Sequence, residues 1–369
     1  FNLNTGFQVY ENLGVKHSDR YQYVLPSYNY SRALNLDSII DGSVEFYSSG
    51  SNKLKNTNNT RTSIINDLNY GTYDYFKFGF KNNFNLNLKN SNTIGKKDPI
   101  YDETPNLDGM SIFEVNSMYP LIKKNDSFKE IITPKISFRL NPGNNMKDHS
   151  SSVKNISADN IFEINRLGIS DSFEAGKSLT LGIEYKLDYE NDFILTNGDT
   201  NYMNEDENYI NEDENYIKDK FFEFKLATVL RDTEESEIPE SSTLNKKTSN
   251  LFGSINSQLS QNLHFDYDFS VDNDFNSFES HSFNGTITVN NFITEFDFLE
   301  QKNEIGSSHS YSYKTSYKIN ENNTLSFATR RNKEILLTEY YDLAYEYKND
   351  CLTAALKYNR NFYKDDDFV

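Results

Sequence analysis

Polar and apolar residues alternate along much of this chain with the two-residue period of a β-strand. The segment 263–272 reads LHFDYDFSVD, so its Leu, Phe, Tyr, Phe and Val share one face and its His, Asp and Ser residues share the other. The same alternation recurs in segments 179–188, 311–319, 341–348 and 352–359, and more weakly in 78–88, 222–230 and 292–298. These segments are about ten residues long, which suits a tilted strand that crosses a bilayer, whereas soluble strands average about five or six.

The connections between these segments are of two kinds. Short polar turns occur at 260–262, 320–323 and 349–350, and they favour antiparallel neighbours because Asn and Asp tolerate turn conformations. Longer hydrophilic stretches occur at 50–59, 92–108, 142–160, 189–217 and 232–247. This pattern is typical of a barrel with short turns on one side of a membrane and long loops on the other.

One connection contains an internal repeat, NYMNEDE followed by NYINEDE at 201–214. A helical heptad is one interpretation, but the repeat lacks an apolar seam, so a solvated surface loop is favoured. Its clustered carboxylates could hold divalent cations, although an acidic run is usually only a hydrated loop.

The alternation predicts an all-β protein: an antiparallel transmembrane β-barrel of the outer-membrane type. We expect residues 1–369 to form part of one such barrel, with about 16–18 strands of a larger wall. The competing interpretation is a soluble adhesin built as a β-sandwich or β-helix. Long strands with aromatic residues on one face and charges on the other argue against it, because sandwiches carry shorter strands richer in Val and Ile.

Composition narrows the function. Tyr (26) and Phe (28) compensate for a hydrophobic content of only 36%, because they supply much apolar surface. The net charge of −18 and the lack of a basic stripe disfavour a nucleic-acid partner. With one cysteine, Cys351, the chain has no internal disulfide. No apolar run approaches the roughly eighteen residues of a transmembrane helix. The chain begins at Phe1 without a signal peptide, so we interpret it as a fragment of a longer protein.

The sequence carries no recognisable catalytic, metal-binding or cofactor-binding motif, and we expect no enzymatic activity and no cofactor. The five His residues are scattered. Strand alternation instead predicts a set of polar side chains that face a wet lumen: His264, Asp266, Asp268, Lys314, Lys318 and Glu346.

Residues 132–187 go beyond this general pattern. The run ITPKISFRLNP is followed, after a polar insert, by NIFEINRLGISDSFEAGKSLTLGIEYKL. It resembles the central barrel region of the LptD family, the outer-membrane lipopolysaccharide-assembly proteins of Gram-negative bacteria. In that family a Pro-containing strand leads into a loop with an Asn-Arg, Gly, Asp-Arg, Gly series. The glycine is displaced to Gly168 here, and Ser172 stands where the family usually has Arg. The matching positions are Pro134, Asn165, Arg166, Asp171, Glu174 and Gly176.

A second stretch, YEYKNDCLTAALKYNRNFYKDDDF at 345–368, is similar to the family's C-terminal cysteine-bearing hairpin. The resemblance implies that Cys351 pairs with a cysteine of an N-terminal periplasmic domain, although many relatives have an adjacent pair of cysteines where this chain has one. A free thiol is the alternative.

The resemblance implies transport rather than catalysis. Family members receive lipopolysaccharide from a periplasmic Lpt bridge and release it into the outer leaflet of the outer membrane, with the lipoprotein LptE seated in the lumen. The expected partners are therefore lipopolysaccharide, an LptE-like lipoprotein, the periplasmic bridge and outer-membrane lipid. The alternative is a passive porin or a TonB-dependent receptor with the same strand pattern.

Overall fold

The computed structural model describes residues 1–12, 20–34, 41–56, 58–143, 146, 153–189 and 220–362. These residues form one antiparallel sheet, and the only helices among them are two single 3-10 turns, Lys77–Gly79 and Glu240–Ser242. No helix in this part of the chain is long and apolar enough to cross a membrane. The strands are β1 (Asn2–Glu11), β2 (Tyr21–Leu34), β3 (Ser43–Lys55), β4 (Thr60–Tyr75), β5 (Lys81–Lys96), β6 (Asn106–Met118), β7 (Leu121–Lys124), β8 (Phe128–Asn141), β9 (Gly176–Tyr189), β10 (Phe221–Leu230), β11 (Leu251–Ser260), β12 (Leu263–Val271), β13 (Phe278–Val289), β14 (Phe292–Gln301), β15 (Ser308–Asn320), β16 (Asn323–Asn332), β17 (Leu337–Lys348) and β18 (Thr353–Asn361).

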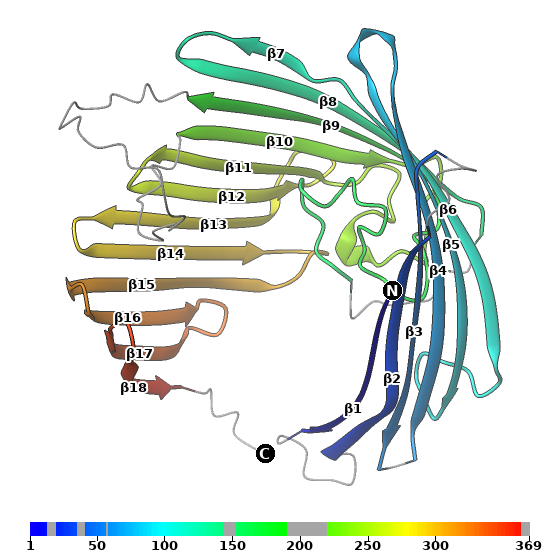
Figure 1. Ribbon diagram of the computed structural model, residues 1–369, viewed down its shortest axis with the longest axis horizontal. Helices are drawn as coiled ribbons and strands as arrows, with labels where there is room; N and C mark the ends of the chain where they lie inside the picture. Colours follow the sequence, from blue (N-terminus) through cyan, green and yellow to red (C-terminus); the bar gives the residue numbers. More distant parts are fainter. Residues whose placement is uncertain are drawn as a thin grey trace, which may run out of the picture.

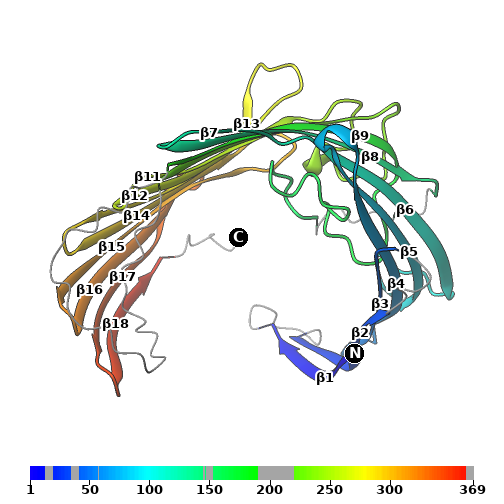
Figure 2. The same ribbon diagram turned by 45° about the horizontal axis from the view of Figure 1, so that its top comes forward.

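Each strand pairs antiparallel with its neighbour in sequence, and the sheet curls into a deeply concave wall (Figures 1 and 2). The one irregularity lies at β6–β8. There β8 pairs with β6 along its C-terminal part and with the short β7 along its N-terminal part. Pro134 lies at this junction, where its missing N–H is tolerated because β6 has just ended. Among the described residues, β1 pairs only with β2 and β18 only with β17, so the wall is open along these two edges.

The sheet has two chemically distinct faces, as the alternation predicts. Tyr and Phe side chains cover the convex face; in β12, Phe265, Tyr267 and Phe269 lie there, and their rings contact aromatic neighbours on β12 and β13. The opposite residues of the same strand lie on the concave face, which is lined mainly by polar side chains. No second sheet covers the aromatic face within the described ranges, so a β-sandwich is excluded. The predicted all-β antiparallel class is confirmed, with 18 strands.

Three expectations from the sequence need correction. Phe78 and Phe80 precede β5 rather than belong to it, because the chain turns at Phe78, whose φ is +76°, and at Gly79, whose φ is +90°. The predicted stretch 50–59 belongs largely to β3, which runs to Lys55. The predicted loop 92–108 is shorter, since β5 extends to Lys96 and β6 begins at Asn106.

The predicted division into a short-turn side and a long-loop side is also wrong in one place. The connection between β9 and β10 leaves the sheet at the end that carries the turns 261–262, 321–322 and 349–352. This follows from the register, because Phe221 pairs with both Asp188 and Gln258. The acidic repeat 201–214 belongs to this connection and lies outside the described residues.

The two faces can be told apart by placing one charge on each. Leu343→Arg puts a guanidinium on the convex face of β17, where Leu343 is 45% exposed, and Ala344→Arg puts it on the concave face. If lipid covers the convex face, Leu343→Arg lowers the free energy of unfolding by about 2–4 kcal/mol, while Ala344→Arg has a much smaller effect. Urea unfolding in lipid vesicles measures both. Equal losses would mean that the convex face does not contact lipid.

Candidate functional site

Two connections fold back against the concave face instead of extending away from the wall (Figures 1 and 2). We call residues 153–175, between β8 and β9, together with residues 231–250, between β10 and β11, the inner segment. The predicted loop 232–247 falls entirely within it, and the predicted loop 142–160 overlaps it at 153–160. The polar composition of these loops did not reveal that they pack on the sheet.

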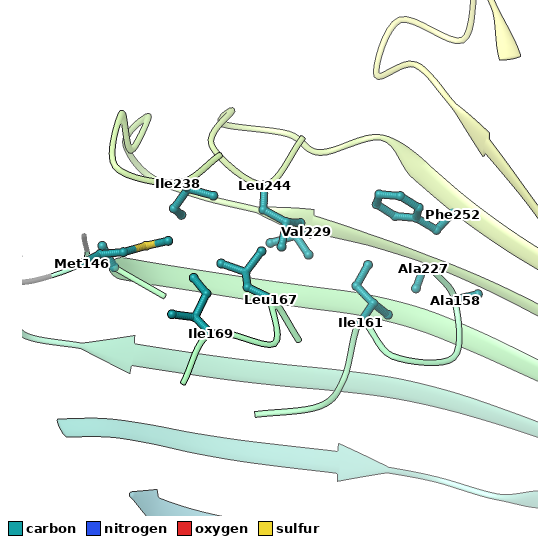
Figure 3. Packing of buried hydrophobic residues seen from close by; sticks show 11 residues of the cluster. Met146, Ala158, Ile161, Leu167, Ile169, Ala227, Val229, Ile238, Leu244 and Phe252 are labelled. Carbon is teal, nitrogen blue, oxygen red and sulfur yellow. The ribbon is translucent and has the colours of Figure 1, made fainter. Parts of the chain in front are cut away.

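An apolar cluster attaches the inner segment to the wall (Figure 3). Val229 of β10 and Phe252 of β11 project from the sheet, and Ile161 and Leu244 of the inner segment pack on them. All four side chains are at most 2% exposed. The complete cluster comprises Met146, Ala158, Ile161, Leu167, Ile169, Ala175, Ala227, Val229, Ile238, Leu244 and Phe252. Burial of such side chains contributes about 1.5–3 kcal/mol each, which explains why these connections stay against the sheet.

A buried ionic network lies beside this cluster, centred on Glu174. Arg166 donates to both carboxylate oxygens of Glu174, from Nε at 2.6 Å and from Nη2 at 2.5 Å. Arg139 of β8 donates to Glu174 Oε2 at 3.2 Å, and Arg231 donates to Oε1. Arg139 also binds Glu114 of β6 through Nη2 at 2.5 Å. We call these three arginines and two glutamates the Glu174 network.

The arginines of the network have most of their remaining donors satisfied. Arg166 is fully buried and also donates to the carbonyl of Ile161 at 3.2 Å and the hydroxyl of Thr180 at 2.9 Å. Burial, and then the nearby guanidinium of Arg139, lower the pKa of Arg166 well below its ordinary value. Burial and Arg166 likewise lower the pKa of Arg231 to about 9. Three cations share two carboxylates here, so Glu174 is the residue on which the balance of charge depends.

Local backbone geometry positions Arg166 and Glu174. The Asn165 side chain accepts from the N–H of Ile169 at 3.2 Å and donates to its carbonyl at 2.8 Å, which closes the turn that follows Arg166. Gly168 in this turn has φ +69°, and Gly176, at the start of β9, has φ +77°. The positive φ favours glycine at Gly176, and a side chain there would also have to displace the carboxylate of Glu235.

The connection between β5 and β6 forms a further attachment. The Tyr101 hydroxyl donates to Asp171 at 3.0 Å, and Lys89 of β5 donates to the carbonyl of Ser170 at 2.8 Å. Burial, and then the charge of Asp171, raise the pKa of the Tyr101 phenol, so this donor stays protonated at neutral pH.

Four of the residues singled out from the sequence, Asn165, Arg166, Asp171 and Glu174, lie in the inner segment, and the structure brings Arg166 and Glu174 into direct contact. Sequence reasoning missed Glu114, Arg139 and Arg231. Their only signal was position, because the first two are charged residues on the concave side of β6 and β8. Ser172, which stands where the similar family has Arg, is fully buried. Arg231 supplies the third guanidinium on Glu174.

The structure places all six predicted lumen-facing residues on the concave face, which the registers connect from strand to strand. His264 Nε2 lies 3.0 Å from Asp266. Lys314 donates to Glu295 of β14 at 3.0 Å. These residues are spread over β12 to β17 and do not converge on one point. They line a surface and form no compact reaction centre.

Cys351 is exposed in the turn between β17 and β18, and its N–H donates to the Asn349 side chain at 3.0 Å. The thiol is free and accessible at the end of the wall that carries the short turns.

The wall, its exposed aromatic outside and its polar inside define the class: the chain forms part of a transmembrane β-barrel. No family model matches the chain, and no curated protein matches it. The solved structures that match include two mutants of the Rh. blastica porin. One covers 82% of this chain and 92% of its own at 8% identity and a TM-score of 0.26, and the other covers 96% and 100% at 7% identity and 0.25. Such low TM-scores carry no argument about fold or function.

Replacement of Glu174 by Gln tests whether the network anchors the inner segment. The substitution leaves three buried guanidinium groups with one carboxylate, so we expect the free energy of unfolding to fall by about 3–5 kcal/mol. Glu346→Gln, on the open concave face, is the matched control and changes it by less than about 0.5 kcal/mol. Urea unfolding, with proteolysis of residues 153–175 as a local readout, measures both. An unchanged cleavage rate in Glu174→Gln would show that the network does not hold the segment.

Proposed function

We propose that this chain is the wall of an outer-membrane translocon of the LptD type, which moves lipopolysaccharide to the outer leaflet. The observation that carries the proposal is the meeting of Arg166, Asp171 and Glu174 in the inner segment. These residues were selected because 132–187 resembles the LptD family. Two of them then form one buried ionic network, and the third ties the segment to another connection. The residues that carry the resemblance are therefore also residues that hold the inner segment in place.

The chemistry of the two faces supports the same proposal. An amphiphile with a large sugar portion needs a wet, polar surface for its sugars and an apolar phase for its acyl chains. The concave face offers hydroxyl, amide and charged side chains, and the convex face offers Phe, Tyr and Leu. The activity that we propose is transport in which no covalent bond is made or broken.

A passive porin is the second candidate, because its wall has the same two faces. The inner segment argues against free diffusion, since it fills part of the concave side between β6 and β11. Passive diffusion through a porin also gives no role to the residues of 132–187 that resemble the LptD family. The two candidates therefore differ in whether the glycolipid itself contacts the concave face.

Site-specific photocrosslinking distinguishes them. A photoreactive amino acid at Ser326, on the concave face of β16, is compared with one at the adjacent Phe327 on the convex face, both in the full-length protein in cells. Ser326 lines an open hollow of about 590 Å³ between β15 and β18. We expect lipopolysaccharide adducts at position 326 that disappear when the supply of lipopolysaccharide from the inner membrane is stopped. At position 327 we expect no such dependence. The proposal fails if adducts at 326 are absent or independent of supply.

The free thiol supplies a separate prediction. We propose that Cys351 forms a disulfide with a periplasmic domain of the full-length protein, in line with its exposed position in a turn. Cys351→Ser in that protein should slow maturation and remove a faster-migrating band from non-reducing gels. Ser260→Ala, in another turn at the same end, is the control and should leave both unchanged. If Cys351→Ser matures at the normal rate with an unchanged non-reducing pattern, the disulfide is absent.

A further inference from the structure

A cavity of about 760 Å³ lies on the concave side of β1 to β4, where residues of the β5–β6 connection and of the inner segment close one side of it. It is separate from the Glu174 network and from the hollow at β15–β18. Its volume lies within the range of small-molecule binding sites, about 300–1,000 Å³. A smaller cavity of about 160 Å³ adjoins it, and Gln22, Lys53 and Arg61 line both cavities.

The lining of the larger cavity is rich in hydroxyl and amide groups. Wall residues that contribute them are Gln8, Gln22, Asn29, Ser49, Ser51 and Ser63. These side chains both donate and accept hydrogen bonds, which is what a ligand covered with hydroxyl groups requires. Tyr10 and Tyr101 add aromatic surface, and a tyrosine ring combines an apolar face with a polar hydroxyl. Such a lining fits a saccharide better than an acyl chain.

The positively charged residues that line the two cavities differ in whether a carboxylate already pairs with them. Arg61 binds Asp98 through two hydrogen bonds of 2.7 and 2.9 Å, so its charge is already matched. Burial would raise the pKa of Asp98, but the hydrogen bonds from Arg61 and from the N–H groups of Ile100 and Tyr101 outweigh it and hold that pKa below its ordinary value. Asp98 therefore remains ionised and keeps Arg61 engaged.

Lys53 and Lys55 differ from Arg61 in this respect. Both lie on the concave side of β3, and neither forms an ion pair or a side-chain hydrogen bond with another described residue. In a protein with a net charge of −18, two adjacent lysines without a carboxylate partner favour an anionic group at this place.

We propose that this cavity binds a phosphorylated oligosaccharide, with Lys53 and Lys55 at the phosphate and the hydroxyl and amide side chains at the sugar rings. The inference rests on the proposed function, because it names the part of the glycolipid that the wall contacts and the place where contact occurs. Arg61 and Asp98 are positioning residues that hold the β5–β6 connection over the cavity.

Binding of a lipid-free ligand tests the site without transport. The probe is the oligosaccharide obtained from lipopolysaccharide by complete deacylation, with its phosphates retained, and the comparison ligand is the same material after dephosphorylation. Calorimetry with the detergent-solubilised full-length protein measures both. We expect the phosphorylated form to bind at least about tenfold more tightly, because hydrogen bonds to charged groups are worth more than neutral ones. We also expect this advantage to shrink as salt is raised.

Three variants assign the effect to the cavity. Lys53→Gln should weaken binding of the phosphorylated oligosaccharide about tenfold, and Lys53→Arg should restore most of it. Lys129→Gln makes the same charge change on the concave face of β8, outside both this cavity and the hollow at β15–β18, and should alter binding less than about twofold. Heat-modifiable migration on gels shows that each variant is folded. Equal affinity for the dephosphorylated ligand, or equal losses in Lys53→Gln and Lys129→Gln, would overturn the site.

This outcome is independent of the crosslinking at Ser326. If adducts at position 326 depend on lipopolysaccharide supply but the oligosaccharide does not bind, the cavity is not a saccharide site. The transport proposal is then unaffected. If instead the oligosaccharide binds in a phosphate-dependent way that Lys53→Gln abolishes, but no adducts form at position 326, the cavity is a saccharide site and the transport proposal fails.

Discussion

The structure depends on the backbone hydrogen-bond ladder between consecutive antiparallel strands. In a bilayer no water is present to bind an unpaired N–H or C=O group, so a strand can be placed there only beside another strand. The ladder fixes the side-chain alternation, because consecutive residues must point to opposite faces. It also accounts for Pro134, which lacks an N–H and lies where β6 gives way to β7. The two faces therefore differ in chemistry over most of the wall: aromatic and aliphatic residues outside and hydroxyl, amide and charged residues inside.

The inner segment shows a second level of organisation. Its apolar residues pack on Ala227, Val229 and Phe252, and its charged residues meet in the Glu174 network. A buried ion pair adds little net stability by itself, because desolvation of the charges offsets their attraction. Its effect is on specificity, since a guanidinium that lost Glu174 would be buried without a partner. The network therefore selects one position of the segment against the wall.

The sequence was informative about the strands and less informative about the connections. Alternation over β12, β15 and β17 specified both the strands and their faces, because each residue in a strand reports the environment of one face. The connections have no such period. The apolar residues of 153–175, such as Ile161 and Leu167, are not spaced with the period of a strand. Arg166 and Glu174 were found only through a family resemblance. Arg139 and Arg231 lie 27 and 65 residues from Arg166 in the sequence, and only the folded wall brings them together.

The attachments of the inner segment also bear on how the wall can deform. They reach from Lys89 on β5, through Arg139 on β8, to Asn250, whose side chain donates to Ser270 of β12 and to Glu279 of β13. These attachments connect strands that would otherwise be coupled only to their immediate neighbours. The strands outside this arc, β1 to β3 and β15 to β18, are joined by their ladders and by side-chain pairs across them. Motions that widen or narrow the lumen should therefore be concentrated in these strands, while β5 to β13 move together as one stiff unit.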